Sequence, residues 1–340
     1  MTTFLVIAIF IALFAASILI AAACLRLGLR FVKVENVRWR TVMTTILMMS
    51  VANLILLFVA TAATSLGSNQ AIAGSLIQLV GGVVAACLLI SKRFHVKPGR
   101  AFLAWLPTLL FPLVYFPFTH FVLRPYVLES FSAPTNSMAP TILGTHLRAT
   151  CAICGAPAYQ AARDPRFSYS DSPHYAICET KFHVSEPHSS SGAVQSADRF
   201  MTIKFLQPRR WDVVTFRVPS SPEEIYVKRL VGLPGEEIVI KDGAVWANGV
   251  RLVQPASMGE IEYLSEIEGY DGTLSGTEKS PARLREGEYF VLGDFSAFSV
   301  DSRFWSRGAP GHAAYAVPES HLLGVVTHIY WPPSRWHTLR

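Results

Sequence analysis

The first third of the chain alternates between long apolar stretches and short polar segments. Each stretch is about 20 residues long and lacks Asp, Glu, Lys and Arg, so it can cross the hydrocarbon core of a bilayer as a helix. The first stretch lacks the basic start of a cleavable signal peptide, and it is longer than the apolar core of one. We therefore expect it to remain in the protein as a transmembrane helix. We predict a membrane region at 1–123 with about four transmembrane helices, at 3–25, 41–63, 71–90 and 101–122.

The remaining residues, 124–340, contain short apolar alternations that are broken by Gly, Pro and Asp. This pattern is typical of antiparallel strands joined by turns, and no long helical stripe interrupts it. We predict a mostly antiparallel β domain whose strands include Asp212–Arg217, Ile225–Val231, Glu237–Ile240 and Glu288–Leu292. Two segments rich in polar, small or acidic residues, 173–193 and 259–279, are expected to be surface excursions.

Composition and charge support a membrane protein. The chain is 51% hydrophobic and only 16% charged, which is too apolar for an ordinary soluble enzyme. The loops after the first and third stretches are basic, whereas loop 65–70 has no charge; the basic residues are Arg26, Arg30, Lys33, Arg38, Arg40, Lys92, Arg93, Lys97 and Arg100. Basic loops remain in the cytoplasm, so the β domain is expected on the outer side. Topology thus explains much of the net charge of +6, and no nucleic acid partner is expected.

A serine and a lysine are the candidate catalytic residues. Ser137 follows the last apolar stretch closely, in the run Thr135–Thr141, and no histidine pattern that would activate it lies nearby. A hydroxyl is a weak nucleophile and needs a base, which can be a neutral lysine. Lys228 lies in an apolar strand, where desolvation would lower its pKa. The adjacent Arg229 is expected to point to the opposite face of the strand.

Four blocks of the chain resemble the type I signal peptidases, which are membrane-anchored serine proteases with a Ser/Lys dyad. The blocks occur in the family's order, before a similar tail at 317–332, and comprise 137–141, 210–216, 226–235 and the pair Gly293-Asp294 with 299–303. The resemblance covers the β domain apart from insertions. It implies a membrane anchor followed by a mostly antiparallel β catalytic domain of the signal peptidase type.

The resemblance also implies a role for each matching residue. Ser137 is similar to the nucleophile and Lys228 to the general base. The Ser137 N–H and the Thr135 hydroxyl would form the oxyanion hole, although many bacterial members have a serine in place of this threonine. Supporting roles, to hold the lysine amine and to form an ion pair, are implied for Ser299, Asp301 and Arg303.

The implied function is removal of signal peptides from exported preproteins, without a cofactor for catalysis. The implied location is the bacterial cytoplasmic membrane, with several spans and the catalytic domain on the periplasmic side. Membrane lipids and the secretion machinery are the other candidate partners. The main alternative is a catalytically silent, membrane-anchored peptide-binding or assembly factor. A self-cleaving Ser/Lys regulator is disfavoured because no DNA-binding segment is visible.

The chain departs from the family pattern at several positions. Phe295 stands where asparagine is common, and Trp211 replaces the usual glycine before Asp212. Four spans exceed the one or two that are common, and the first three have no role from the resemblance. They provide extra anchoring or a surface for a partner.

The largest departure is an insertion at 145–196, which contains three of the five cysteines. The C-x-x-C-G run at Cys151 and Cys154 is typical of half a zinc site, for which Cys178 could supply a third ligand. The expected fourth ligand is His183, with His174 and His188 as alternatives. A disulfide or the remnant of a lost site would also explain these cysteines. The other two, Cys24 and Cys87, lie in or beside apolar stretches and are expected to pack there.

Overall fold

The structure is a computed structural model that describes residues 2–35, 37–64, 70–162, 175–186, 189–259, 261–267, 270 and 272–339. The chain divides into two compact units, Met1–Val122 and Leu123–Arg340, and each is described by itself. Loop residues 65–69 and the candidate ligands His174 and His188 lie outside the described residues.

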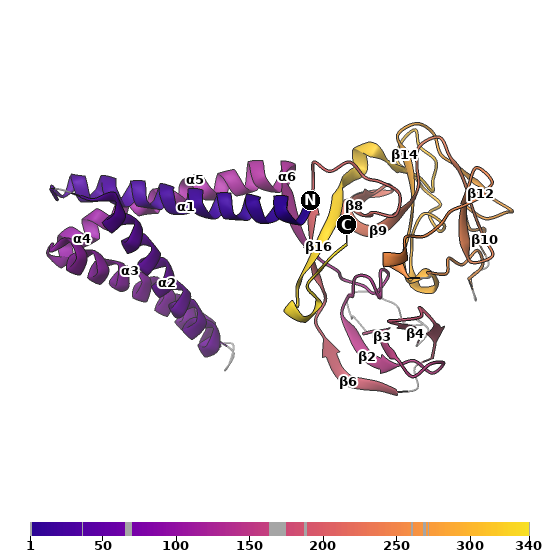
Figure 1. The fold of residues 1–340 in the computed structure, drawn as a ribbon, viewed down its shortest axis with the longest axis horizontal. Helices are drawn as coiled ribbons and strands as arrows, with labels where there is room; N and C mark the ends of the chain where they lie inside the picture. Colours follow the sequence, from indigo (N-terminus) through magenta and orange to yellow (C-terminus); the bar gives the residue numbers. More distant parts are fainter. Residues whose placement is uncertain are drawn as a thin grey trace. The chain divides into compact units, whose positions relative to one another are not determined.

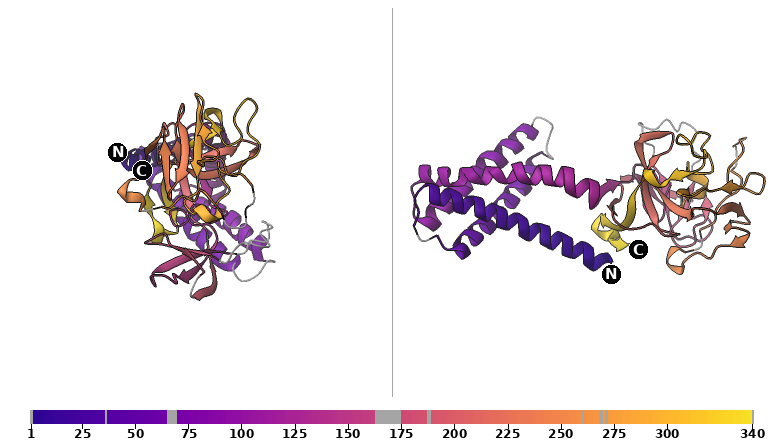
Figure 2. Two further views of the ribbon diagram at one scale, coloured as in Figure 1. Left: turned by 90° about the vertical axis from the view of Figure 1, so that its right-hand side faces the viewer. Right: turned by 90° about the horizontal axis from the view of Figure 1, so that it is seen from above.

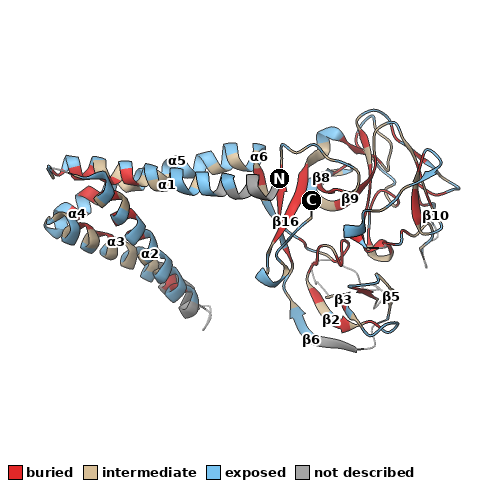
Figure 3. Ribbon diagram, in the orientation of Figure 1, coloured by how far each residue is buried: buried red, intermediate tan, exposed pale blue. Residues whose placement is uncertain are grey.

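The first unit is helical (Figure 1). It comprises α1 (Thr2–Phe31), α2 (Trp39–Thr64), α3 (Gln70–Phe94), α4 (Pro98–Trp105), a 3-10 turn (Leu106–Leu109), α5 (Leu110–Phe118) and a π turn (Thr119–Leu123). Among the described residues, four helical runs are long and apolar enough to cross a membrane: Ile11–Phe31, Trp39–Thr61, Leu76–Phe94 and Pro98–Tyr126. Figure 3 shows that much of their apolar surface is exposed, as a surface facing lipid would be. The prediction of four long apolar helices is confirmed.

The fourth run is interrupted, although the apolar pattern predicts one continuous helix. Pro107 lies in the 3-10 turn and Pro117 lies inside α5. A proline has no N–H to donate to the carbonyl one turn earlier, and its ring crowds that carbonyl. Helices break or tighten at such positions.

Small residues allow the helices to approach one another closely. In both Figures 1 and 2, α1 lies beside α5, and these helices are in contact. A Cβ atom at Gly28 of α1 would lie 1.9 Å from the Ala104 carbonyl oxygen of α4, and one at Gly82 of α3 would lie 2.7 Å from Asn53 Oδ1 of α2. Glycine is therefore required at position 28, where the neighbouring atoms are backbone, and at position 82 it leaves room for the Asn53 side chain. Small residues are common where membrane helices approach one another.

The second unit is built on an eight-stranded antiparallel sheet. Its strand order is β1-β7-β16-β8-β9-β14-β15, with β17 paired to β16. The strands are β1 (Leu128–Ser132), β7 (Arg199–Ile203), β8 (Val213–Val218), β9 (Ser221–Gly232), β14 (Glu288–Leu292), β15 (Val317–Pro318), β16 (Leu322–Trp331) and β17 (His337–Thr338). A short helix, α6 (Arg124–Tyr126), precedes β1. The expected antiparallel β domain is confirmed, and three of its predicted strands correspond to β8, β9 and β14.

A four-stranded sheet has the order β12-β11-β10-β13. It comprises β10 (Glu237–Lys241), β11 (Ala244–Ala247), β12 (Val250–Arg251) and β13 (Ala282–Arg283), and β10 matches the fourth predicted strand. Segment 259–279 was expected to be a surface excursion, but it buries Ile261, Tyr263 and Leu274 to 5% exposure or less. The expectation is therefore wrong for these apolar side chains, because Ile261 and Tyr263 join the core cluster that includes Ile238 and Val245 of this sheet.

The insertion forms a third sheet, with the order β5-β4-β3-β2-β6. Its strands are β2 (His146–Thr150), β3 (Pro157–Ala161), β4 (Ala176–Cys178), β5 (Val184–Ser185) and β6 (Ser189–Gln195). All neighbouring strands are antiparallel. Residues 145–196 thus provide a small sheet of their own, which the sequence pattern does not reveal.

Candidate active site

The turn after β1 presents Ser137 and is fixed on both sides. The side-chain oxygen of Asn136 accepts a hydrogen bond from the Gly144 N–H at 2.7 Å, which closes the turn. Met138 is 1% exposed and packs in the core between β7, β8 and β16. The Ser137 carbonyl accepts a hydrogen bond from the Phe295 N–H at 3.1 Å. The backbone around the candidate nucleophile is therefore tied to β14's loop and to the core.

Lys228 reaches Ser137 from β9. Its Nζ atom lies 2.8 Å from Ser137 Oγ, and it also donates to its neighbour's carbonyl, that of Val227, at 3.2 Å. Lys228 is 4% exposed and Ser137 is 8% exposed. Among the described residues, no carboxylate lies within 4.0 Å of the amine. The structure brings together the two residues that the sequence pairs.

Burial lowers the pKa of Lys228 from 10.5 to about 8. Desolvation disfavours the charged ammonium and is the main cause. The negative charges of Asp301 and Asp294 act in the opposite direction, and the positive charge of Arg303 adds to the lowering. The amine is thus uncharged in a useful fraction of molecules near neutral pH, as a general base requires.

Thr135 lies beside the nucleophile. Its hydroxyl is 3.5 Å from Ser137 Oγ, at the limit of a hydrogen bond, and the side chain is partly buried. A hydroxyl at this distance can turn toward an oxygen that is bound next to Ser137. The assignment of Thr135 to an oxyanion hole stays a prediction.

Ser299 is buried next to the same turn without a hydrogen-bond partner for its hydroxyl among the described residues. A Cβ atom at Gly293 would lie 2.0 Å from Ser299 Oγ and 2.6 Å from the Ser137 carbonyl oxygen. Glycine at 293 is therefore what lets Ser299 approach the nucleophile turn. The hydroxyl does not contact Lys228 in this conformation, so its role in holding the amine stays a prediction.

Asp301 and Arg303 form a fully buried ion pair. The guanidinium donates to both carboxylate oxygens, each at 2.9 Å. Asp301 also accepts from the Gly293 N–H at 3.0 Å, and Arg303 donates to the carbonyls of Leu264 and Ser296. The pair connects the loop after β14 to segment 259–279, which agrees with the expected supporting ion pair.

A second buried ion pair escaped the sequence reasoning. Arg229 Nε donates to Asp294 Oδ1 at 2.7 Å, and the exposed fractions of the two side chains are 4% and 0%. Thr141, four positions after the nucleophile, donates to the same carboxylate. The sequence does show that Arg229 is a charged residue in an apolar strand and that Asp294 lies in a family block. Neither observation identifies the partner of the other residue. The partners of Lys228 and Arg229 differ, as expected for adjacent positions in a strand.

The structure shows the surroundings of the two residues that depart from the family pattern, Trp211 and Phe295. Trp211 has a φ of 73°, in the left-handed region where a side chain is strained, which explains why glycine suits this position. Phe295 is 1% exposed and packs with Tyr159 and Ile177 of the insertion. The residue that replaces the common asparagine therefore contacts the inserted sheet.

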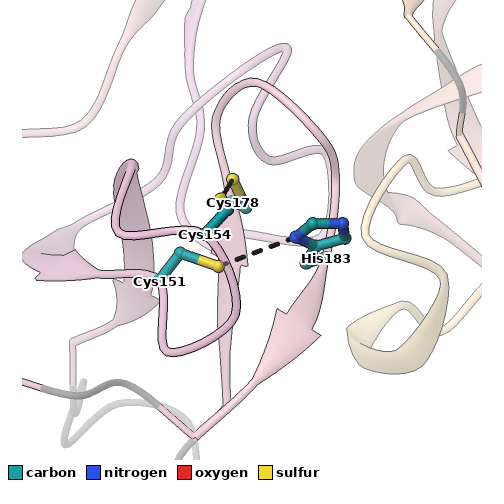
Figure 4. Close-up of side chains that lie close together, drawn as sticks. All are labelled: Cys151, Cys154, Cys178 and His183. Atoms are coloured by element: carbon teal, nitrogen blue, oxygen red, sulfur yellow. Dashed lines mark hydrogen bonds between the residues drawn. The ribbon is translucent and has the colours of Figure 1, made fainter.

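The insertion brings together the four candidate metal ligands. Figure 4 shows Cys151, Cys154, Cys178 and His183 gathered between two turns, and their ligand atoms all lie within 4.8 Å of one another. They are carried by the third sheet, whereas Lys228 and Ser137 belong to the first sheet and the turn after its edge strand. The chemistry of this cluster is separate from that of the dyad.

Comparison with known proteins gives consistent matches. A family model described as signal peptidase, peptidase S26, matches residues 174–331, a segment that includes Lys228 and begins after Ser137. Signal peptidase I of Pseudomonas aeruginosa is 30% identical, over 39% of this chain and 53% of the relative. Signal peptidase I V of Bacillus subtilis is 32% identical, over 38% and 67%, and signal peptidase I of Leptolyngbya laminosa is 30% identical, over 47% and 71%.

The matched regions thus span between 53% and 71% of the length of these relatives. The two relatives from Bacillus subtilis and Leptolyngbya laminosa combine at least 30% identity with coverage of two thirds or more of their length. The antiparallel β domain and the apolar helices that precede it in the chain agree with a relationship to these peptidases. The chain belongs to the signal peptidase family, peptidase S26.

Proposed function

We propose that this protein is a membrane-bound serine endopeptidase that removes signal peptides from exported preproteins. The observation that carries the proposal is the 2.8 Å contact between the Lys228 amine and the Ser137 hydroxyl in a buried setting. A serine needs a base that is within hydrogen-bond reach and can lose its proton, and burial supports this for Lys228 by lowering its pKa to about 8. The relatives that are named signal peptidase I support the substrate class.

In the proposed reaction, the neutral Lys228 amine takes the proton of Ser137 while Oγ attacks the carbonyl carbon of the scissile peptide bond. The resulting oxyanion accepts hydrogen bonds from the Ser137 N–H and the Thr135 hydroxyl. The carbon–nitrogen bond then breaks, and the Lys228 ammonium gives its proton to the leaving amine of the mature protein. The signal peptide remains as an ester on Ser137.

Water completes the cycle. The amine of Lys228, neutral again, takes a proton from a water molecule as its oxygen attacks the ester carbonyl. The ester bond breaks, the signal peptide leaves with a new carboxyl group, and the proton returns to Ser137 Oγ. Every step uses groups of the chain and one water molecule, so the proposed reaction needs no cofactor.

The order of the chain suits a substrate that emerges from a membrane. The nucleophile follows the fourth apolar run, Pro98–Tyr126, after a short connection. A signal peptide carries its cleavage site just after an apolar core. The basic loops favour a cytoplasmic membrane location with the catalytic domain outside. Lipids and signal peptides are therefore the proposed partners, and the secretion machinery is a further one.

The test is cleavage of a preprotein by the full-length protein in detergent. Ser137→Ala and Lys228→Met should each reduce kcat/KM by about 1,000-fold or more. Matched controls are Ser220→Ala and Lys241→Met, which change an exposed serine and a partly exposed lysine away from the dyad and should leave cleavage unchanged. An inactive wild type would support the silent assembly factor instead. Full activity in both dyad variants would refute the Ser/Lys mechanism.

A further inference from the structure

Two hairpin turns meet at one end of the inserted sheet. The turn between β2 and β3 carries Cys151 and Cys154; Cys178 ends β4, and His183 lies in the turn between β4 and β5. Strands β3 and β4 are antiparallel neighbours, with Ala158 opposite Cys178. Both turns therefore lie at the same end of the sheet, and each contributes two side chains to one cluster (Figure 4).

The distances within the cluster match those of a tetrahedral metal site. The sulfur atoms of Cys154 and Cys178 are 3.6 Å apart, and Cys151 Sγ is 3.8 Å from His183 Nδ1. Ligands at about 2.3 Å for sulfur and about 2.0 Å for nitrogen are separated by roughly 3.5 to 3.8 Å around a tetrahedral zinc ion. The remaining pairs lie within 4.8 Å, so small side-chain movements would close the tetrahedron.

Main-chain hydrogen bonds fix the backbone around the cluster. Gly155, with a φ of 70°, turns the chain after Cys154, and its N–H donates to the Cys151 carbonyl at 2.9 Å. The Cys151 N–H donates to the Ala156 carbonyl, and the Cys178 N–H donates to the His183 carbonyl, each at 2.9 Å. These main-chain hydrogen bonds fix both turns, and so the places from which the four side chains reach the cluster.

The apolar packing on this side of the sheet is too thin to explain why the two turns stay together. Its core cluster consists of Ala149, Cys151, Ala158, Ala176 and Cys178, with Ala156 beside it. Alanine side chains bury little apolar area, and small domains with a weak core commonly rely on a disulfide or a metal. One disulfide between any two of the three cysteines would leave the third unpaired. A metal uses all three and the histidine.

The other side of the same strands packs against residues next to the nucleophile turn. Tyr159 of β3 and Ile177 of β4 pack with Leu143, which follows the nucleophile turn, and with Phe295. Ile177 immediately precedes Cys178, so a ligand and a packing residue are consecutive on one strand. The position of the two hairpins is therefore connected to that of the turn that presents Ser137.

We propose that Cys151, Cys154, Cys178 and His183 bind one structural Zn²⁺ ion, which holds the two hairpin turns together and supports the nucleophile turn. Three thiolates and one imidazole in a tetrahedron are characteristic of zinc, and four protein ligands leave no open position for catalysis. Bound zinc is measured directly, without a cleavage assay. A failure of the proposed peptidase function would therefore not affect this test of the metal site.

The zinc content of the full-length protein tests the proposal. The protein is purified in detergent under reducing, oxygen-free conditions without a chelator, and zinc per chain is measured by elemental mass spectrometry. Wild type should hold about one zinc ion, and Cys154→Ser should hold less than about a tenth of that. Cys24→Ser and Cys87→Ser are matched controls, because these free cysteines lie in α1 and α3, and both should retain the metal.

His183 provides a test by rescue. His183→Ala should lose the ion, whereas His183→Cys should retain it as a four-cysteine site. Where a variant does not fold, wild type stripped of metal and titrated with Co²⁺ should show the visible absorption of a tetrahedral thiolate site. Cleavage activity of wild type should fall on stripping and return with Zn²⁺.

Three results would overturn the proposal. The first is wild type without zinc under these conditions. The second is a zinc content in Cys154→Ser and His183→Ala equal to that of wild type, which would mean an adventitious ion only. The third is a disulfide among Cys151, Cys154 and Cys178, seen by intact mass after alkylation without reduction.

Discussion

The Nζ atom of Lys228 lies 2.8 Å from the Oγ atom of Ser137, although 91 positions separate the two residues in the chain. The contact forms because β9 places the lysine side chain, paired in register with Val214 of β8, under the turn that follows β1. Both side chains are removed from solvent. In the proposed mechanism the pair transfers a proton without a histidine, and the charge state of the Lys228 amine controls that step.

The first prediction concerns the pH dependence of cleavage. Because burial lowers the pKa of Lys228 to about 8, the neutral base is lost as the pH falls through that value. The wild-type kcat/KM should decrease about tenfold per pH unit below about 7 and level off above about 9. Initial rates on a preprotein between about pH 6 and 10 measure this. A flat profile down to about pH 6 would contradict Lys228 as the base.

The second prediction is that Lys228→Met inactivates the enzyme but stabilises its fold. The folded pKa of about 8 lies below the ordinary 10.5, so between these values the unfolded chain binds more protons and stability rises with pH. Below about pH 8 the buried amine is charged, and its desolvation lowers the free energy of unfolding of wild type by an amount on the order of 3 kcal/mol. The variant should unfold at a higher temperature than wild type at pH 7.

The pH dependence of this difference is the control for the second prediction. Near pH 10.5 the lysine is neutral in most folded molecules, so the gap in unfolding temperature between Lys228→Met and wild type should shrink. Lys241→Met, at a partly exposed position, should show no such gap at either pH. A constant gap would mean that methionine packs better and that the charge is not the cause.

The third prediction separates two neighbouring serines. Ser299 has a buried hydroxyl without a hydrogen-bond partner among the described residues, whereas the Ser302 hydroxyl accepts a bond from the Val291 N–H at 3.0 Å. If the Ser299 hydroxyl holds the Lys228 amine during the reaction, Ser299→Ala should reduce kcat by about tenfold or more without loss of stability, because the folded protein has no other hydrogen bond to that hydroxyl among the described residues. Ser302→Ala should lose about 1 kcal/mol of stability and keep kcat. The opposite pattern would remove Ser299 from the catalytic machinery.

The fourth prediction concerns the buried pair of Arg229 and Asp294. Asp294→Asn leaves an uncompensated guanidinium in the interior, which should reduce the free energy of unfolding by about 3–5 kcal/mol. Thermal unfolding measures this. Glu237→Gln breaks the exposed pair with Arg283 and should leave the unfolding temperature unchanged. Equal effects of the two variants would show that burial does not govern these pairs.

Local pattern and family order predict the parts of the molecule that depend on nearby residues. The apolar runs predict the membrane helices, strand alternation predicts β9 and β14, and the ordered blocks pair Ser137 with Lys228. The break in the fourth helix was not predicted, although its cause, Pro107 and Pro117 inside the apolar run, is visible in the sequence.

Contacts between residues that are far apart in the sequence cannot be predicted from local pattern. The partner of Arg229 is an aspartate 65 positions away, selected by the register of β9 against β14. Tyr263 is fully buried because β10 and β11 lie beside it, although its own segment is rich in Gly and acidic residues. The inserted sheet has short, alanine-containing strands with little hydrophobic periodicity, so its topology depends on turns and on tertiary contacts.

The last prediction concerns Phe295, which joins the insertion to the active site. Its ring packs with Tyr159 and Ile177, and its N–H donates to the Ser137 carbonyl. Phe295→Ala should lose about 3–5 kcal/mol of stability through the cavity, and the loosened turn should reduce kcat more than it raises KM. Phe295→Leu fills much of the space and should recover most of both losses.

Hydrogen exchange in the same variants tests the path of this effect. In Phe295→Ala, amides of β3 and of the turn at 135–141 should exchange faster together, while those of β10 and β11 should be unchanged. Phe205→Ala, at a half-exposed phenylalanine, is the control and should alter neither region. If Phe295→Ala loosened only the insertion and kept the wild-type kcat, the inserted sheet would not support the nucleophile turn. Joint loosening would mean that an element foreign to the family pattern helps to position the family's nucleophile.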